Sequence, residues 1–328
     1  MALITPVDSA ELAIFLEDYD LGRLIRATPL EAGSVNSNFA LELGAGRFFL
    51  RLYEEQDFDG ARRDADTAAE LAKAGVPTPA PIERRLEGPH GSLLGELAHK
   101  PAVILPWCEG DIICQKRVTR SHVRAVGAAL ASMHLSGAAL ASRYGAGRFR
   151  YEDLQKRIDR IASAKEISIA RVAQKVRDRL ESVHRSRDVN LPRGLSHGDL
   201  FRDNVLFGTK DKMPIVLALL DFESAHEGSL VYDLMVTTLA WCVGDALDTE
   251  LARALVSGYE SVRKLDAIEK AGAHAEARFA AVRFWITRIT DYAMRLGVGK
   301  GRDPKRFEMR LDAIESMGAS RFEKQIFV

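Results

Sequence analysis

Residues 195–207 read LSHGDLFRDNVLF, and residues 219–223 read LLDFE. The first stretch contains the spacing H-x-D-x-x-x-x-N, which ends at Asn204 and has Asp199 as its aspartate, and the second places Asp221 after a short apolar run. This order is typical of the catalytic loop and metal loop of enzymes that transfer phosphoryl groups. Such transfer needs an acceptor for the proton of the attacking hydroxyl and cations that bridge the phosphate oxygens of ATP. The pattern therefore predicts Asp199 as the proton acceptor and Asn204 and Asp221 as ligands of Mg²⁺.

Each part of this pattern also has an ordinary structural explanation. A His-x-Asp sequence can form a turn, Asp-Asn can cap a strand, and Asp221 can end a buried strand. The ordered set in its expected structural context favours phosphoryl transfer. His197 is then expected to be structural and to brace the loop. Asp233 starts an apolar helical stretch, so we expect it to be an N-terminal cap or a brace for the same loop.

The first part of the chain carries the signals of a small sheet with a helix. Residues 39–52 alternate apolar side chains on both sides of Gly44-Ala45-Gly46, which predicts a β-hairpin. Residues 61–75 are rich in helix formers and end at a glycine, so a helix is expected after the hairpin. Residues 102–107 are typical of a buried strand, and the turn Glu109-Gly110 follows them. The boundary between two lobes should therefore fall near residue 107.

Helical periodicity dominates the rest of the chain, with long charged helical stretches over residues 151–186. Two short apolar runs, residues 204–207 and 215–220, predict a small β-hairpin set into this helical half, with a polar turn between them. We predict an α+β fold with a sheet-rich nucleotide-binding lobe over residues 1–107. A mostly helical catalytic and substrate-binding lobe is expected over residues 108–328.

The sheet-rich lobe should also supply a loop over the phosphates and a cation on its third strand. The loop before the hairpin contains small and polar residues, Gly33 and Ser34 among them, but it has no G-x-G-x-x-G and such a stretch is usually an ordinary turn. Arg51 stands where a lysine is expected, and Asp64 is the best carboxylate to pair with it. Glu70 is a competing partner, and a solvated position on the helix surface is an equally open explanation for either acid.

Composition narrows the class of protein. The 46 basic and 46 acidic side chains cancel, so we expect neither nucleic acid nor a membrane as a partner, and a small molecule fits better. The three cysteines form no CxxC pair, which argues against a disulfide framework and a zinc knuckle. The sequence has no signal-peptide pattern and no apolar stretch that could span a bilayer, so a cytoplasmic protein is expected. Its oligomeric state is not indicated.

Around these residues the chain resembles the aminoglycoside phosphotransferase and choline kinase superfamily, whose members have a protein-kinase-like bilobal fold and phosphorylate small molecules. Within it, the chain is most similar to the type II homoserine kinases, on the segments GSVNSNFALEL, FFLRLYE, HLSGAAL, HGDLFRDNVLF, LLDFESA, VYDLMVTTLAWCV and GYESVR. The resemblance implies that ATP and Mg²⁺ are used to phosphorylate the side-chain hydroxyl of L-homoserine in threonine biosynthesis. Glu223 departs from the glycine of the protein-kinase D-F-G motif, which disfavours a protein substrate.

Homoserine is a zwitterion, so its pocket needs an acid for the ammonium group and a cation or backbone amides for the carboxylate. Glu223 and Arg288 are the candidates, although the sequence does not determine their distance from Asp199. One alternative is a kinase of another hydroxyl compound, such as an aminoglycoside, choline or a methylthio-sugar. The other is a nucleotide-binding regulator without catalysis, which the poor glycine loop and Arg51 favour.

Overall fold

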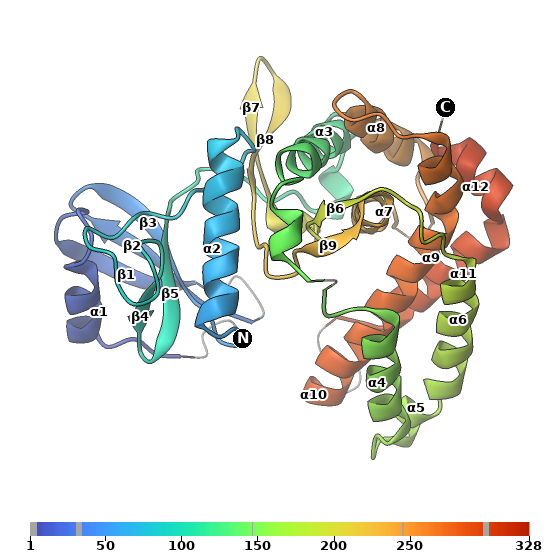
Figure 1. The fold of residues 1–328 in the computed structure, drawn as a ribbon, viewed down its shortest axis with the longest axis horizontal. Coiled ribbons are helices and arrows are strands. Elements are labelled where there is room, and N and C mark those ends of the chain that lie inside the picture. The colour runs from blue at the N-terminus through green and yellow to red at the C-terminus, as the bar shows by residue number, and fades with distance from the viewer. Residues whose placement is uncertain (1–4, 31–34, 146, 245, 298–301, 328) are drawn as a thin grey trace. The chain divides into compact units, whose positions relative to one another are not determined.

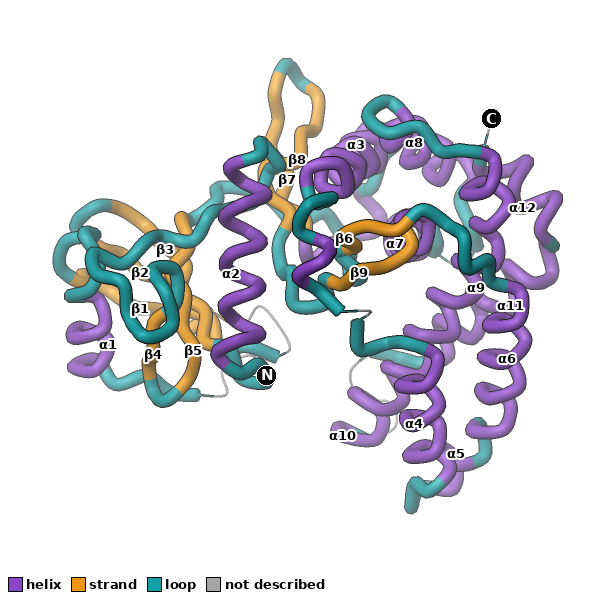
Figure 2. Tube along the Cα trace, viewed as in Figure 1, coloured by secondary structure: helices purple, strands orange, loops and turns teal. Residues whose placement is uncertain are grey.

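The structure, a computed structural model, describes residues 5–30, 35–145, 147–244, 246–297 and 302–327. The chain forms two compact units. Unit 1 comprises Met1–Asp111, Leu206–Gly208 and Val216–Glu223, and unit 2 comprises Ile112–Val205, Thr209–Ile215 and Ser224–Val328. Strands are concentrated in unit 1 and helices in unit 2 (Figure 2). The lobe boundary at residue 107 stays a prediction from the sequence.

A five-stranded antiparallel sheet forms the centre of unit 1 (Figure 1). Its strands run in the order β1-β2-β3-β5-β4 and cover Leu24–Leu30 (β1), Ser37–Leu43 (β2), Gly46–Leu52 (β3), Gly95–Leu97 (β4) and Lys100–Pro106 (β5). The β2–β3 register pairs Leu43 with Gly46 and Phe39 with Leu50, so the predicted hairpin is confirmed. The predicted buried strand before residue 107 is β5, which pairs with β3.

Two helices pack against opposite faces of this sheet. Alternate side chains of a strand point to opposite faces, and those of Leu50 and Ile104 join the helix α1 (Ser9–Leu16) in one apolar cluster. On the other face, Val103 and Tyr53 pack with alanines of the helix α2 (Phe58–Lys73). The side chain of Asp57 caps α2 by accepting a hydrogen bond from the amide of Gly60. The predicted helix after the hairpin is thereby confirmed.

The second hairpin consists of β7 (Val205–Lys210) and β8 (Met213–Leu219). Its turn consists of Asp211 and Lys212, whose φ values of 51° and 63° suit a two-residue hairpin turn. The predicted hairpin is confirmed, and its residues are divided between the units: residues 206–208 and 216–219 belong to unit 1, and residues 209–215 belong to unit 2. A two-stranded hairpin leaves backbone groups free on both edges. One of these groups, the amide of Leu219, donates a hydrogen bond to the carbonyl of Pro77 at 2.7 Å.

Unit 2 is mostly helical, and the helical stretches predicted over residues 151–186 are confirmed. Its α-helices are Arg120–Ser136 (α3), Tyr151–Ala162 (α4), Ile167–Ala170 (α5), Ala173–Ser186 (α6), Leu230–Trp241 (α7), Thr249–Glu260 (α8), Ala267–Arg288 (α9), Met294–Leu296 (α10), Lys305–Met317 (α11) and Ala319–Ile326 (α12). Every residue of α7 is buried, so this helix forms the centre of the unit. A small sheet of β6 (Arg193–Ser196) and β9 (His226–Ser229) lies next to it (Figure 1). In the part of the chain that the structure describes, no helix combines the length and apolar character that crossing a membrane requires.

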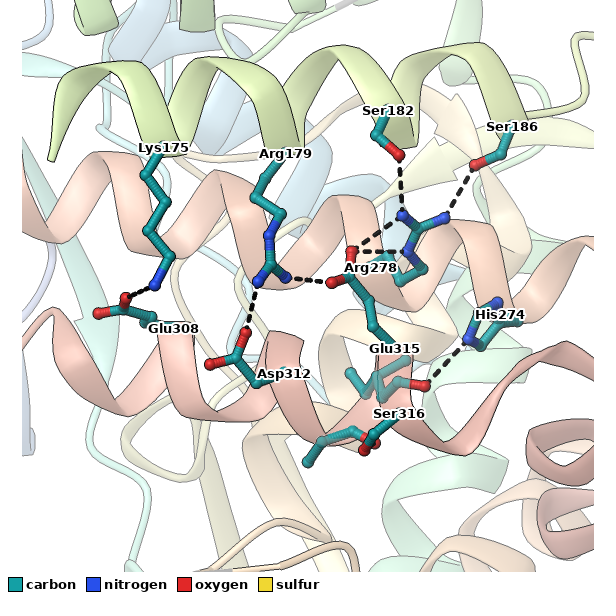
Figure 3. A network of polar contacts seen from close by, with 12 residues as sticks. Lys175, Arg179, Ser182, Ser186, His274, Arg278, Glu308, Asp312, Glu315 and Ser316 are labelled. Carbon is teal, nitrogen blue, oxygen red and sulfur yellow. Dashed lines mark hydrogen bonds and ion pairs between the residues drawn. The ribbon is translucent and has the colours of Figure 1, made fainter.

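Charged side chains join α6, α9 and α11 on the surface of unit 2 (Figure 3). Arg278 of α9 donates to Glu315 of α11 from two nitrogens, at 3.1 and 2.9 Å, and to serines of α6. Arg179 of α6 bonds the same Glu315 and Asp312. The three helices are therefore connected by one polar network in addition to their apolar contacts.

Replacing Arg278 by methionine is expected to lower the free energy of unfolding by about 1–2 kcal/mol, because several charge-assisted hydrogen bonds are lost while Arg179 still pairs with Glu315. Urea unfolding followed by circular dichroism measures this difference. Lys175→Met is the matched control, since its ion pair with Glu308 is half exposed and should contribute less than about 0.5 kcal/mol. Equal losses in both variants would contradict the expected contribution of the network.

Candidate active site

The catalytic-loop candidate begins where β6 ends. His197 is completely buried, and Gly198 adopts a φ of 76°, in the left-handed region that favours glycine. A Cβ atom at Gly198 would lie 2.7 Å from the carbonyl oxygen of Ser224, so space as well as conformation requires glycine here. The chain therefore turns sharply between His197 and Asp199. This turn leaves the side chain of Asp199 about one-third exposed.

Asp233 holds this turn from the first turn of α7. Its carboxylate accepts hydrogen bonds from the backbone amides of His197 and Gly198, at 2.6 and 2.8 Å, and it lies 3.0 Å from Nε2 of His134. Burial alone would raise the pKa of this carboxyl, but the hydrogen bond from His134 and the charges of His134 and His197 outweigh burial and lower the pKa of Asp233. Nδ1 of His134 in turn lies 2.7 Å from the hydroxyl of Tyr259. The turn is thus supported by a buried polar network.

The other end of α7 holds the residues that follow Asp199. The indole nitrogen of Trp241 donates to the carbonyl of Leu200 at 3.0 Å. Arg202 donates to the carbonyl of Ala240 and to the side chain of Gln115. The loop is therefore tied to both ends of one buried helix.

Asn204 closes the loop at the end of a short 3-10 turn, Arg202–Asn204. Its amide nitrogen donates to the carbonyl of Asp199 at 2.8 Å. Because the amide nitrogen is used in this way, the oxygen of the same group is the atom suited to a metal ligand.

Arg283 of α9 faces the carboxylate of Asp199, with 3.5 Å between Nη1 and Oδ1. The sequence patterns do not single out Arg283, which lies five residues before Arg288 on α9. The structure places Arg288 on the ring of Phe307, with 4.4 Å from its guanidinium carbon to the ring centroid, and its Nη1 donates to the carbonyl of Asp303 at 3.3 Å. Burial, together with Arg302 and Arg310, lowers the pKa of Arg288 to about 10.

A second cluster of predicted residues lies in unit 1. Nη1 of Arg51 lies 3.7 Å from Glu223 and 3.9 Å from Asp221. Asp64 accepts a hydrogen bond from the hydroxyl of Tyr53. Burial alone would lower the pKa of Arg51, but Asp221 and the other negative groups around it raise that pKa. Asp64 remains electrostatically close to Arg51 and is buried, whereas Glu70 is partly exposed.

Two carboxylates of this cluster have unusual properties. Asp221 follows β8 with a φ of 69°, a left-handed conformation that is uncommon for residues other than glycine and that aspartate adopts more readily than most. Burial, and then the charge of Asp221, raise the pKa of Glu223 to about 7. Asn36 donates a hydrogen bond to Glu223. The predicted loop residues Gly33 and Ser34 lie outside the described residues.

Comparison with known proteins identifies the family of this chain. Residues 26–265 match the family described as the phosphotransferase enzyme family. The homoserine kinase of Brucella anthropi is 34% identical over 334 residues, which cover 99% of this chain and 95% of the relative. The homoserine kinase of Nitrobacter hamburgensis is 33% identical over 333 residues, which cover 98% of this chain and 97% of the relative. This chain belongs to the phosphotransferase enzyme family.

The fold of this phosphotransferase is also found in solved structures. A spectinomycin phosphotransferase, solved in complex with ADP and spectinomycin, superimposes with a TM-score of 0.65. It is 12% identical and covers 98% of this chain and 100% of its own. At that identity the likeness concerns the fold alone. The predicted α+β, protein-kinase-like fold and the predicted family are both confirmed.

The donor chemistry of the phosphotransferase suits Mg²⁺. Among the residues that the structure describes, no group of three or more His, Cys, Asp or Glu side chains could form a metal cage. Mg²⁺ at phosphoryl-transfer sites needs no such cage, because it takes one or two protein oxygens and completes its shell with water and phosphate. The partly exposed carboxylate of Asp221 and the side-chain oxygen of Asn204 are each oxygen donors of the chemical type that Mg²⁺ prefers.

Proposed function

We propose that this phosphotransferase is a homoserine kinase, which transfers the γ-phosphoryl group of ATP to the side-chain hydroxyl of L-homoserine. The observation that carries the proposal is the similarity to homoserine kinases over nearly the whole chain, at about one-third identity on both relatives. The reaction would belong to threonine biosynthesis. Asp199 is the proposed reacting residue, because its side chain is partly exposed and its loop is held by hydrogen bonds to Asp233.

Asp199 is the proposed proton acceptor. Its carboxylate orients the hydroxyl of the substrate and takes the proton as the oxygen attacks the γ-phosphorus, and the bond to the bridging oxygen of ADP breaks. Positioning contributes most of the acceleration in such reactions, because the protein does little covalent chemistry. His197 and Asp233 therefore act as supports, since they hold the turn on which Asp199 stands.

The residues proposed to bind Mg-ATP are those that the sequence pattern predicts. Asn204 and Asp221 are the proposed ligands of Mg²⁺, which neutralises charge on the phosphate oxygens when it is bound. Arg51 is the proposed phosphate contact and Asp64 its supporting acid. The small residues Gly33 and Ser34 are proposed to cover the phosphates.

The charged groups of homoserine need separate partners. Glu223 is proposed for the ammonium group, because it is a largely buried acid in the turn that follows β8, two residues after Asp221. Arg288 is the candidate that the sequence offers for the carboxylate.

A substrate panel tests the proposed function. With Mg-ATP, release of ADP should be fastest with L-homoserine, and its kcat/KM should exceed that for an aminoglycoside, choline or a methylthio-sugar by about 100-fold or more, because a site built for paired charges rejects compounds that lack one of them. Phosphorus NMR of the product should show a phosphate ester on the side-chain oxygen. Turnover of another alcohol without turnover of homoserine would overturn the proposal, and binding of ATP without any turnover would favour a regulator.

A further inference from the structure

The guanidinium group of Arg283 is held inside unit 2 by two aromatic rings. Its carbon lies 3.9 Å from the ring centroid of Phe149 and 3.8 Å from that of Phe284, and the side chain is only 3% exposed. A buried charge is unfavourable unless other groups pair with it and accept its hydrogen bonds. The guanidinium group of Arg283 therefore needs hydrogen-bond acceptors around it.

Two donor nitrogens of Arg283 lack a hydrogen-bond acceptor in the part of the chain that the structure describes. Nε and Nη1 are both buried and have no hydrogen-bonding partner there. The carboxylate of Asp199 lies 3.5 Å from Nη1, which is longer than a normal N–H to oxygen hydrogen bond. An arginine presents its donors as a rigid planar fork, and the matching group is a planar anion with two oxygens. A ligand carboxylate at the end of this fork, on Nη1 and Nη2, would supply the acceptor that Nη1 lacks.

Arg283 lies next to Asp199, and this position limits which ligand could supply the carboxylate. In an extended homoserine molecule the hydroxyl oxygen and the carboxylate are roughly 5 Å apart, by standard bond lengths. Asp199 and Arg283 are close enough for one such molecule to reach both, with its hydroxyl at Asp199 and its carboxylate at Arg283. The two phenylalanine rings hold the plane of the guanidinium group in place, so the position of the bound carboxylate would be defined.

We propose that Arg283 binds the α-carboxylate of the substrate, an inference that rests on the proposed homoserine kinase function. Arg283 then selects small hydroxy amino acids over amino alcohols of the same length. Arg288, whose contacts are with Phe307 and the backbone of Asp303, is assigned to the packing of α9 against α11.

The test compares two substrates that differ in the carboxylate alone, L-homoserine and 3-aminopropan-1-ol. For Arg283→Met, kcat/KM for homoserine should fall by about 100-fold, the effect of losing a charged hydrogen-bonding partner, while kcat/KM for 3-aminopropan-1-ol should change by less than about threefold. Arg283→Lys retains the charge without the fork and should recover part of the preference. The ratio of the two kcat/KM values is independent of the fraction of folded enzyme.

Arg187→Met is the matched control, because Arg187 also stacks on a phenylalanine and pairs with a buried acid of α9, Glu276, without contacting Asp199. Its ratio of kcat/KM values should equal that of the unmodified chain. Equal losses for both substrates in Arg283→Met would make Arg283 a support for Asp199 and overturn the inference. If instead Arg288→Met lowered kcat/KM for homoserine alone, Arg288 would be the residue that binds the carboxylate. If the unmodified chain fails to phosphorylate homoserine, the proposed function falls and this inference falls with it.

Discussion

Asp199→Asn is expected to lower kcat for homoserine by about 10³-fold, because asparagine keeps the shape of the side chain but cannot accept the proton of the hydroxyl. Binding of Mg-ATP should change little, since Asp199 is assigned to the substrate hydroxyl and not to the nucleotide. Steady-state kinetics and titration with an ATP analogue measure the two quantities separately.

Asp203→Asn is the control for this substitution. Asp203 belongs to the same loop and has the same chemistry, but its side chain is half exposed and pairs with Arg302 at 2.6 Å. Its replacement should leave kcat within about twofold, because an exposed ion pair contributes little. Unchanged turnover in Asp199→Asn would remove Asp199 from the chemical step. Joint loss of turnover and nucleotide binding would make Asp199 part of the nucleotide site.

Asp233→Ala should lower the free energy of unfolding by about 3–5 kcal/mol, the range for removing one partner of a buried charged network. Two backbone amides and His134 would lose their acceptor in a completely buried position. Urea unfolding measures the loss. Asp248→Ala, which removes the exposed cap of α8, is the control and should cost only about 1 kcal/mol.

The stabilisation by Asp233 should depend on pH. Because the folded-state pKa of Asp233 is lowered, its contribution is fully present above the unfolded value of about 3.9 and is lost as the pH falls through the folded-state pKa. The difference in stability between the unmodified chain and Asp233→Ala should therefore narrow in acid. A difference below about 1 kcal/mol at neutral pH would contradict the role of Asp233 as a support for the loop.

Local patterns predicted the parts of the fold that depend on neighbours in sequence. The hairpin of β2 and β3 follows from alternating apolar residues around a glycine turn, and α2 follows from its composition and its glycine end. The sequence also predicts that Asp199 and Asn204 lie close together, because both belong to one short loop. The hydrogen bond from Leu219 to Pro77 joins β8 to a segment far away in the sequence, and no local pattern predicts such a contact.

Long-range contacts could not be read from the sequence. His134 lies 99 residues from Asp233 and 125 residues from Tyr259 along the chain, and no spacing rule joins them. Their segments, HLSGAAL and GYESVR, were recognised only as family features. Arg283 was overlooked because an arginine in an apolar helical segment gives no sign of which side chain it faces. The ion pairs of Arg51 with residues after β8 depend on the folded arrangement in the same way.

The attachment of the loop to both ends of α7 has a consequence for substrate binding. Asp233 holds residues 197 and 198, while Trp241 and Ala240 hold Leu200 and Arg202. A flexible loop would lose about 1–2 kcal/mol of conformational entropy per residue if it became ordered only when the substrate arrived. Here that entropy is lost when the chain folds, so more of the interaction energy with the substrate is available for affinity and for orienting the hydroxyl.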